Sequence, residues 1–134
     1  MQKLIQQVSH MSYDHGLGLM VARVVAGLIF FVHGWEKWQN ISGTAHFFGM
    51  LGFAPQVAYF IAALELVGGL ALMLGVWGRF FGLLFGIEML IAAARVGAGK
   101  GFHGFEFELL LAAVSFAIAL AGSGKFAFHN MKFR

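Results

Sequence analysis

The sequence predicts an all-helical integral membrane protein, a four-helix bundle with an interfacial or re-entrant segment between the first two helices. Two observations support this fold class. Hydrophobic residues make up 60% of the 134 residues, with 19 glycines besides, whereas only 11% are charged. A soluble domain of this size needs more charge to cover its surface. In addition, four apolar stretches each approach the roughly 20 residues that a helix needs to cross a bilayer.

The four predicted spans form one domain over residues 1–134. They cover residues 17–38, 56–77, 79–97 and 105–122. The lead, residues 1–16, is polar and mixed and lacks the pattern of a cleaved signal peptide, so we interpret it as a retained segment with a short interfacial helix. The connection 39–55 has three phenylalanines and no formal charge. We expect it to lie in the membrane interface or to dip into the bundle.

The remaining connections predict how the spans are arranged. Gly78 and Arg79 leave room for only a very short turn, so we expect the second and third spans to be antiparallel neighbours. Pro55 suits the first turn of the second span, where its missing N–H is not needed. The glycine-rich stretch 97–104 predicts a flexible loop before the fourth span.

Lysine and arginine near the ends of the spans predict the orientation, because cytoplasmic loops carry more of them. The richer side has Arg23 close to it and carries Lys3, Arg79, Lys125, Lys132 and Arg134. The other side carries Lys37, Arg95 and Lys100. We therefore expect both termini to be cytoplasmic.

Glycines at helical spacing predict where the helices pack, because small residues allow two backbones to approach closely. Seven of them are expected in helix–helix contacts: Gly27, Gly34, Gly68, Gly69, Gly78, Gly82 and Gly86. The last three form a stripe of their own, which suits either packing within the chain or a contact in a homo-oligomer.

Ionisable side chains predict a polar site in the outer half of the bundle. Their positions along the spans bring most of them there: His33, Lys37, Glu65, Glu88, Arg95, Glu106 and Glu108. A charge near the bilayer centre costs about 2.5–3.5 kcal/mol. We therefore expect Glu65 and Glu88 to face the bundle, each either paired with a cation or donor or protonated. Such residues mark functional sites by default, and the alternative is that they are polar staples between helices.

Several segments carry a family resemblance. They are Arg23 with the run GLIFFVHGWEKW (Gly27–Trp38), LGFAP (Leu51–Pro55), ALELVGGLALMLGVWGR (Ala63–Arg79) and the stretch Phe105–His129. Together they resemble the DoxX family of small four-helix bacterial membrane proteins, over roughly Leu17–His129. The resemblance implies a bundle in the bacterial inner membrane. It maps the family pattern onto His33, Gly34, Lys37, Glu65, Gly68, Gly69 and an acidic residue that opens the fourth span.

The identity of that acidic residue stays open at this point. The family's usual spacing favours Glu106, whereas the small-residue stripe of the fourth span (Ala112, Ser115, Ala119) favours Glu108. The two side chains point roughly opposite ways on a helix, so only one of them faces the interior.

The resemblance also implies a function. The family is named after a subunit associated with a thiosulfate:quinone oxidoreductase, so it implies a small subunit or partner of a quinone-linked redox system. His33 and Lys37 have N–H groups for a quinone headgroup, and the buried glutamates suit proton relay. Trp35, Trp38 and the phenylalanine-rich connection either wall this slot or, for the two tryptophans, form an interfacial belt. No residue here carries electrons unaided, so redox chemistry needs a cofactor or a partner subunit.

Other function classes are weighed against this one. A non-enzymatic binding or scaffolding protein would hold a lipid, a small solute or a client protein. A metal site of His33, Glu65, Glu88 and Glu108 has suitable ligands but no local ligand spacing, so we predict no metal. A proton or ion path needs an oligomer, because four helices are few for a pore. The net charge of +3 is too small and scattered for nucleic-acid binding, and the lack of cysteine excludes thiol chemistry.

Overall fold

The computed structural model describes residues 1–9 and 15–127, so Lys132, Arg134 and His129 lie outside the described residues. Four segments are long and apolar enough to cross a membrane. They are α2 (His15–Gln39), α4 (Pro55–Leu74), α5 (Gly78–Ala92) with the π-helical turn η1 (Ala93–Gly97), and α6 (Phe102–Ala121). The described residues contain no strand. The predicted class, an all-helical membrane bundle, is confirmed.

Three shorter helical elements complete the fold. They are α1 (Gln2–Ser9), α3 (Ile41–Met50) and the 3-10 turn η2 (Ala98–Lys100). The first is the short helix expected in the lead. The second forms most of the connection 39–55 and is capped at its N-terminus by Asn40, whose side chain accepts a hydrogen bond from the Gly43 amide. None of the α3 residues is fully buried, and the helix packs against α4.

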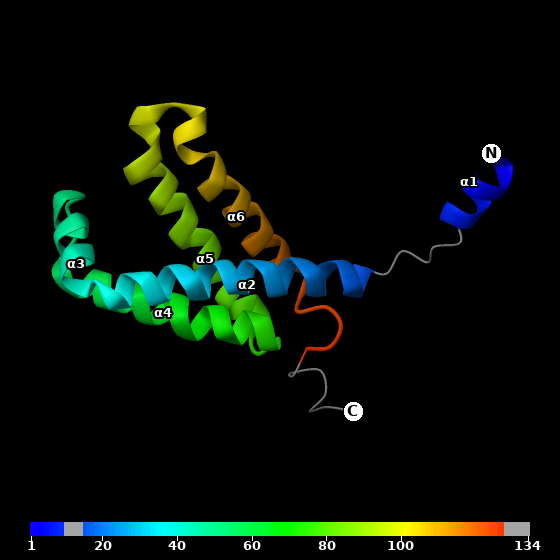
Figure 1. The fold of residues 1–134 in the computed structure, drawn as a ribbon, viewed down its shortest axis with the longest axis horizontal. Coiled ribbons are helices and arrows are strands. Elements are labelled where there is room, and N and C mark those ends of the chain that lie inside the picture. Colours follow the sequence, from blue (N-terminus) through cyan, green and yellow to red (C-terminus); the bar gives the residue numbers. More distant parts are fainter. Residues whose placement is uncertain (10–14, 128–134) are drawn as a thin grey trace.

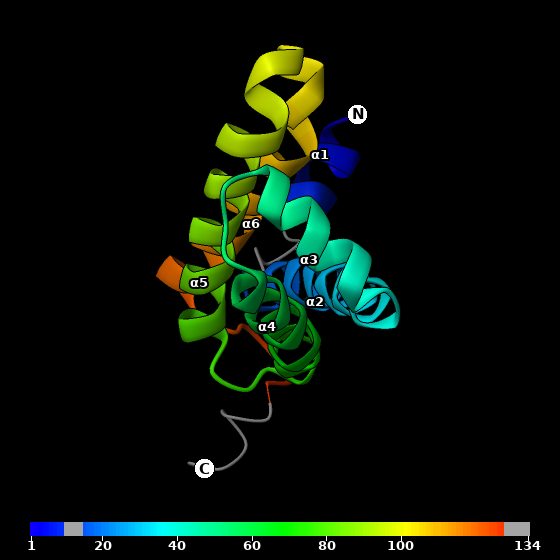
Figure 2. The same ribbon diagram turned by 90° about the vertical axis from the view of Figure 1, so that its left-hand side faces the viewer.

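The spans form two helical pairs that cross each other (Figures 1 and 2). α2 lies along α4, and α5 lies along α6. α4 and α5 touch, but each packs mainly on another helix. The expectation that the second and third spans are close antiparallel neighbours is therefore corrected. The short turn between them joins the two crossing pairs rather than closing a hairpin.

Glycines allow close backbone contact in the α2–α4 pair. A Cβ on Gly27 would lie 2.6 Å from the Gly69 carbonyl oxygen, and a Cβ on Gly34 would lie 2.6 Å from the Leu66 nitrogen. Both distances are shorter than any real Cβ contact, so a side chain at either position would push the helices apart. These glycines fix the register in which the polar side chains of α2 and α4 meet.

The other glycines are covered from within the chain as well. A Cβ on Gly68 would lie 2.6 Å from the ring of Phe85. The stripe of α5 faces α6 and the segment after it: Gly82 meets the backbone of Ser115, Gly86 meets the ring of Phe116, and Gly78 meets the side chain of Ser123. Of the two roles left open for this stripe, packing within the chain is the one that the structure displays.

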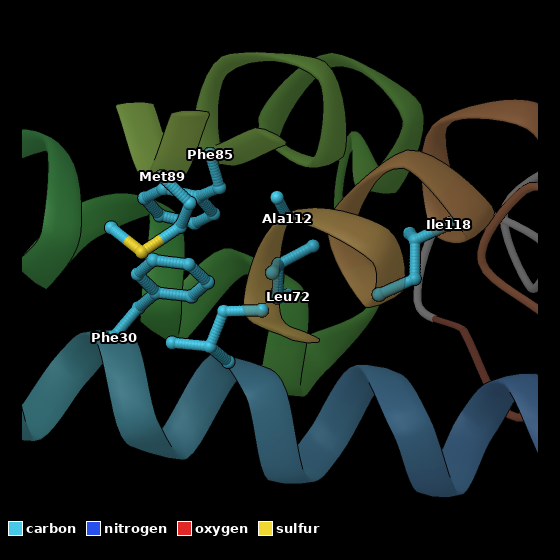
Figure 3. Close-up of a cluster of buried hydrophobic side chains, with 7 residues drawn as sticks. Phe30, Leu72, Phe85, Met89, Ala112 and Ile118 are labelled. Carbon is cyan, nitrogen blue, oxygen red and sulfur yellow. The ribbon is translucent and has the colours of Figure 1, made fainter. Parts of the chain in front are cut away.

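The core lies where the two pairs cross, and all four spans contribute to it (Figure 3). Phe30 of α2 stacks on Phe85 of α5 with ring centroids 3.8 Å apart. Such a pair adds about 0.5–1.5 kcal/mol to the burial of the rings. Leu72, Met89 and Ile118 pack around it. Outside this core many large apolar side chains of the spans are exposed, as expected of a surface that lipid covers.

Two predicted helix ends are corrected. The second span ends at Leu74 rather than 77, because Gly75 adopts a left-handed conformation with φ 77° and closes the helix. The fourth span begins at Phe102 rather than 105, so the flexible loop expected over 97–104 shrinks to η2 and Gly101. In both places a single glycine conformation decided the boundary, and glycine is permissive enough to allow either outcome.

Candidate functional site

A cavity of about 330 Å³ lies at the end of the bundle nearest α3, and both helical pairs line it. We call it the polar cavity because ionisable side chains share its wall with aromatic ones. The ionisable residues are His33, Lys37, Glu65, Glu88, Arg95 and Glu108. The aromatic residues are Phe47, Phe48, Phe53 and Phe107. Six of the seven side chains predicted for the polar site are thus brought together from four spans.

The centre of the polar cavity is an ion pair between the two packed helices α2 and α4. The Lys37 Nζ donates to both oxygens of Glu65, at 2.9 Å to Oε2 and 3.2 Å to Oε1. Glu65 is only 2% exposed, whereas the Lys37 side chain keeps 25% of its surface accessible. Gly34, one turn before Lys37, touches the backbone at Glu65. The pair therefore forms because a residue without a side chain lets the two helices approach at this level.

Glu88 brings a second carboxyl group to this pair from the other side of the cavity. It comes from α5, and its carboxyl lies against that of Glu65, close enough for the two side chains to hydrogen-bond, and near the charge of Lys37. Its Oε2 is buried and has no hydrogen-bond partner among the residues that the structure describes. Two carboxyl groups, those of Glu65 and Glu88, thus lie beside the single ammonium group of Lys37.

Arg95 lies at the rim of the polar cavity. It lies in the π-helical turn η1, a wide turn of a kind that is frequent at functional sites. Its guanidinium lies 5.4 Å from the centre of the Phe53 ring, and its Nη1 donates to the Leu51 carbonyl oxygen at 3.5 Å. The side chain therefore links the end of α5 to the connection between α3 and α4, which forms one side of the cavity.

The structure decides between the two glutamates at the start of α6. Glu108 lines the polar cavity, whereas Glu106 does not. The Glu106 carboxylate is half exposed and lies 3.2 Å from the Nδ1 of His103. The small-residue stripe of α6 therefore gave the better guide to the inward face than the spacing typical of the family.

The aromatic wall differs from one of the expectations. Trp35 and Trp38 are about half exposed, at 49% and 48%, and neither lines the cavity. Trp38 packs edge-on against Tyr59 instead. The phenylalanines of α3 and its connection form the wall, and Phe107 of α6 adds to it, with its ring 6.1 Å from that of His33. Sequence reasoning missed Phe107 because apolar residues dominate every face of α6.

Two other features are alternatives to the polar cavity as a functional site, namely a second hollow and a metal site. A larger hollow of about 590 Å³ lies at the opposite end, but among the described residues Arg79 is the single ionisable one that lines it. Within the described ranges no group of three or more His, Asp or Glu side chains converges closely enough to hold a metal ion. The structure therefore gives no support to the metal alternative at His33, Glu65, Glu88 and Glu108.

Fold and cavity together define a class: a multi-pass membrane protein with a small polar cavity lined by two crossing helical pairs. The chain belongs to the DoxX family, whose model matches residues 18–98, a range that contains Lys37, Glu65 and Glu88. It is also 40% identical over 114 residues to a Bacillus subtilis (strain 168) protein named "Putative oxidoreductase CatD". That match covers 84% of this chain and 85% of the relative. No solved structure matches the chain.

Proposed function

We propose that this protein is a quinone-binding small subunit or partner of a membrane redox system in the bacterial cytoplasmic membrane. One observation carries the proposal: phenylalanine rings and a buried, paired carboxylate share the wall of one cavity. At about 330 Å³ this cavity is at the small end of ligand-binding pockets. A single substituted ring with two polar oxygens matches that size and that mixture of surfaces.

The residues that line the cavity have different roles in such a site. The Lys37 ammonium and the His33 ring provide N–H groups at the cavity wall, and the phenylalanines provide flat apolar contact. Oxidation of a quinol releases two protons and two electrons. Glu88 and Glu108 are carboxyl groups at the wall that suit proton transfer. The electrons go to a partner redox subunit, because the chain has no cysteine and no side chain that carries electrons unaided.

The name of the Bacillus subtilis relative, an oxidoreductase, supports redox chemistry of this kind. The charge pattern supports an orientation with both termini in the cytoplasm, which places the polar cavity toward the periplasmic side. A topology reporter fused after Arg134 would test this. An external reading would reverse the orientation without affecting the cavity itself.

A second function is favoured by the same lack of an electron-carrying side chain. A non-enzymatic binding or scaffolding protein would use the cavity to hold a lipid, a small solute or a client protein. Native mass spectrometry of the purified protein separates the two functions. A retained lipid or protein, together with no binding of quinone or quinol, would favour the scaffold.

The direct test is ligand binding to the purified protein in detergent under argon, with tetramethylhydroquinone and its quinone as probes. We expect saturable binding of at least one form to the wild type. Glu65→Gln should weaken that binding about tenfold, because it removes the charge that holds Lys37. Glu106→Gln is the matched control outside the cavity and should bind as the wild type does. Failure of both probes to bind, also in the presence of membranes that supply partner subunits, would refute the proposal.

A further inference from the structure

We infer that the hollow at the end of the bundle opposite the polar cavity binds the headgroup of an anionic phospholipid, and that Arg79 contacts its phosphate group. The hollow has a volume of about 590 Å³, within the usual range for ligand pockets. No described residue lines both this hollow and the polar cavity. The inference is therefore independent of the quinone proposal, and the failure of one leaves the other intact.

The hollow lies where three spans begin or end. The beginning of α2, the turn before α5 with the first residues of α5, and the end of α6 with the segment after it form its wall (Figure 1). Spans of about 20 residues cross the hydrocarbon core, so their ends lie at the level of the lipid headgroups. Two lining residues suit this level, because Trp77 is 62% exposed and Phe80 is 52% exposed, and aromatic rings of tryptophan are enriched at membrane interfaces. A lipid therefore reaches the hollow from the bilayer.

Arg79 is the cation in this wall, and its side chain is exposed. It makes no hydrogen bond or ion pair within the described part of the chain. Its guanidinium lies beside Gly122, where an added Cβ would be 3.4 Å from Nε and 3.5 Å from Nη2, so that residue has no side chain to cover it. A guanidinium matches the oxygens of a phosphate group in a bidentate arrangement. Arg79 is thus accessible to an anion that comes from outside the chain.

The charge around the hollow distinguishes between lipids. None of the described acidic residues lines it, whereas Glu65, Glu88 and Glu108 line the polar cavity at the other end. A phosphatidylcholine headgroup has a cation for which the described wall holds no anion, whereas phosphatidylglycerol carries the phosphate charge alone. Basic pockets between spans are known sites for anionic headgroups, and one arginine near the membrane surface changes the dissociation constant about fivefold. We expect a preference for phosphatidylglycerol of that size.

The experiment measures dissociation constants of phosphatidylglycerol and phosphatidylcholine with identical acyl chains, by native mass spectrometry of the delipidated full chain in detergent. Wild type should bind phosphatidylglycerol about fivefold more tightly than phosphatidylcholine. Arg79→Gln should bring this ratio close to one, whereas Arg79→Lys keeps the charge and should keep most of the ratio. Lys100→Gln is the matched control. It removes one cation from an exposed position just beyond the other end of the same span and should leave the ratio unchanged.

Two further arms identify the anion that Arg79 binds. Inorganic phosphate in large excess should not displace phosphatidylglycerol, because it has no acyl chains to place beside the apolar residues of the wall. Arg79→Gln is also made in an Asp14→Asn protein, since Asp14 closely precedes the lining residue Gly16 in the sequence and lies outside the described residues. The loss on Arg79→Gln should be the same in both backgrounds.

Several results would overturn the inference. A wild-type ratio close to one removes the selectivity, and an equal loss in Arg79→Gln and Lys100→Gln indicates general attraction to the charge of the protein. Displacement by inorganic phosphate indicates a site for the free anion. A loss on Arg79→Gln confined to the Asp14→Asn background makes Asp14, not a lipid, the partner of the arginine. Should Arg79→Gln fail to elute as a folded species, the wild-type ratio and the phosphate competition still decide.

Discussion

Two cations on the same helix, the half-buried Lys37 and the buried Arg23 of α2, have very different surroundings. Lys37 is paired with a carboxylate and borders the polar cavity. Arg23 is 1% exposed, and its Nη2 donates to the Lys125 carbonyl oxygen at 3.4 Å. Its Nε and Nη1 have no hydrogen-bond partner within residues 1–9 and 15–127. The guanidinium lies against Gly75, the residue that ends α4.

The difference shows that Lys37 belongs to a candidate binding site, whereas Arg23 has a structural role as an anchor between segments. The Lys37–Glu65 pair holds two opposite charges at a cavity wall, where a ligand meets both. Arg23 joins α2 to the end of α4 and to the segment after α6, and it touches no carboxylate among the described residues. Removing one partner of a buried ion pair leaves an uncompensated charge, whereas removing a cation that has no anion does not. The following predictions test this contrast.

Glu65→Lys should have the largest effect. It would place a second cation against Lys37 where the wild type has 2% exposure, and the neighbouring Glu88 carboxyl is one group facing two cations. We expect no folded, monodisperse protein from detergent extraction, as judged by size-exclusion chromatography. Glu65→Gln is the control and should fold. Equal yield and melting behaviour of both variants would contradict the burial of this side chain.

Lys37→Met should destabilise the protein by about 3–5 kcal/mol, the range for breaking a buried pair. The free energy of unfolding is measured by SDS titration in detergent micelles. The double variant Lys37→Met with Glu65→Met should recover most of that loss, because it leaves no unpaired charge. If the two single effects simply add in the double variant, the pair is not coupled.

Gly34→Ala should cost about 1–3 kcal/mol, as overpacking against a backbone does. Its Cβ would meet the Leu66 nitrogen at 2.6 Å. Gly18→Ala, on the same helix, meets nothing within 4 Å and should be neutral or stabilise by up to about 1 kcal/mol. A circular-dichroism melt in detergent that moves both variants in the same direction would argue against close packing at Gly34.

Arg23→Met should cost the least, less than about 2 kcal/mol, because the lost packing is offset by removing a buried charge that has no anion within residues 1–9 and 15–127. Ligand binding in the polar cavity should be unchanged, since Arg23 is not among its lining residues. The same SDS titration and the hydroquinone binding assay check both statements. If Arg23→Met lowers the free energy of unfolding as much as Lys37→Met does, the two cations do not differ in this way.

The positions of the spans were predictable from sequence, and so was the inward face of α4. Glu65, Gly68 and Gly69 share a helix face by spacing alone, and all three are buried. The partner of each face was not predictable. The short turn at Gly78 favoured packing of α4 on α5, whereas the close approach of Gly27 to Gly69 brings α2 onto α4. Contact between distant segments depends on shape, which periodicity does not encode.

The hydrophobic composition and four apolar stretches by themselves determined a membrane-spanning helical protein, because backbone groups in lipid must satisfy one another within a helix. Helical spacing then determined which ionisable groups turn away from lipid. Only the tertiary structure decided that Lys37 pairs with Glu65, that Glu108 rather than Glu106 reaches the cavity, and that an oxygen of Glu88 lacks a partner among the described residues. These outcomes depend on distances of a few ångströms between helices, and the crossing of the two pairs sets those distances.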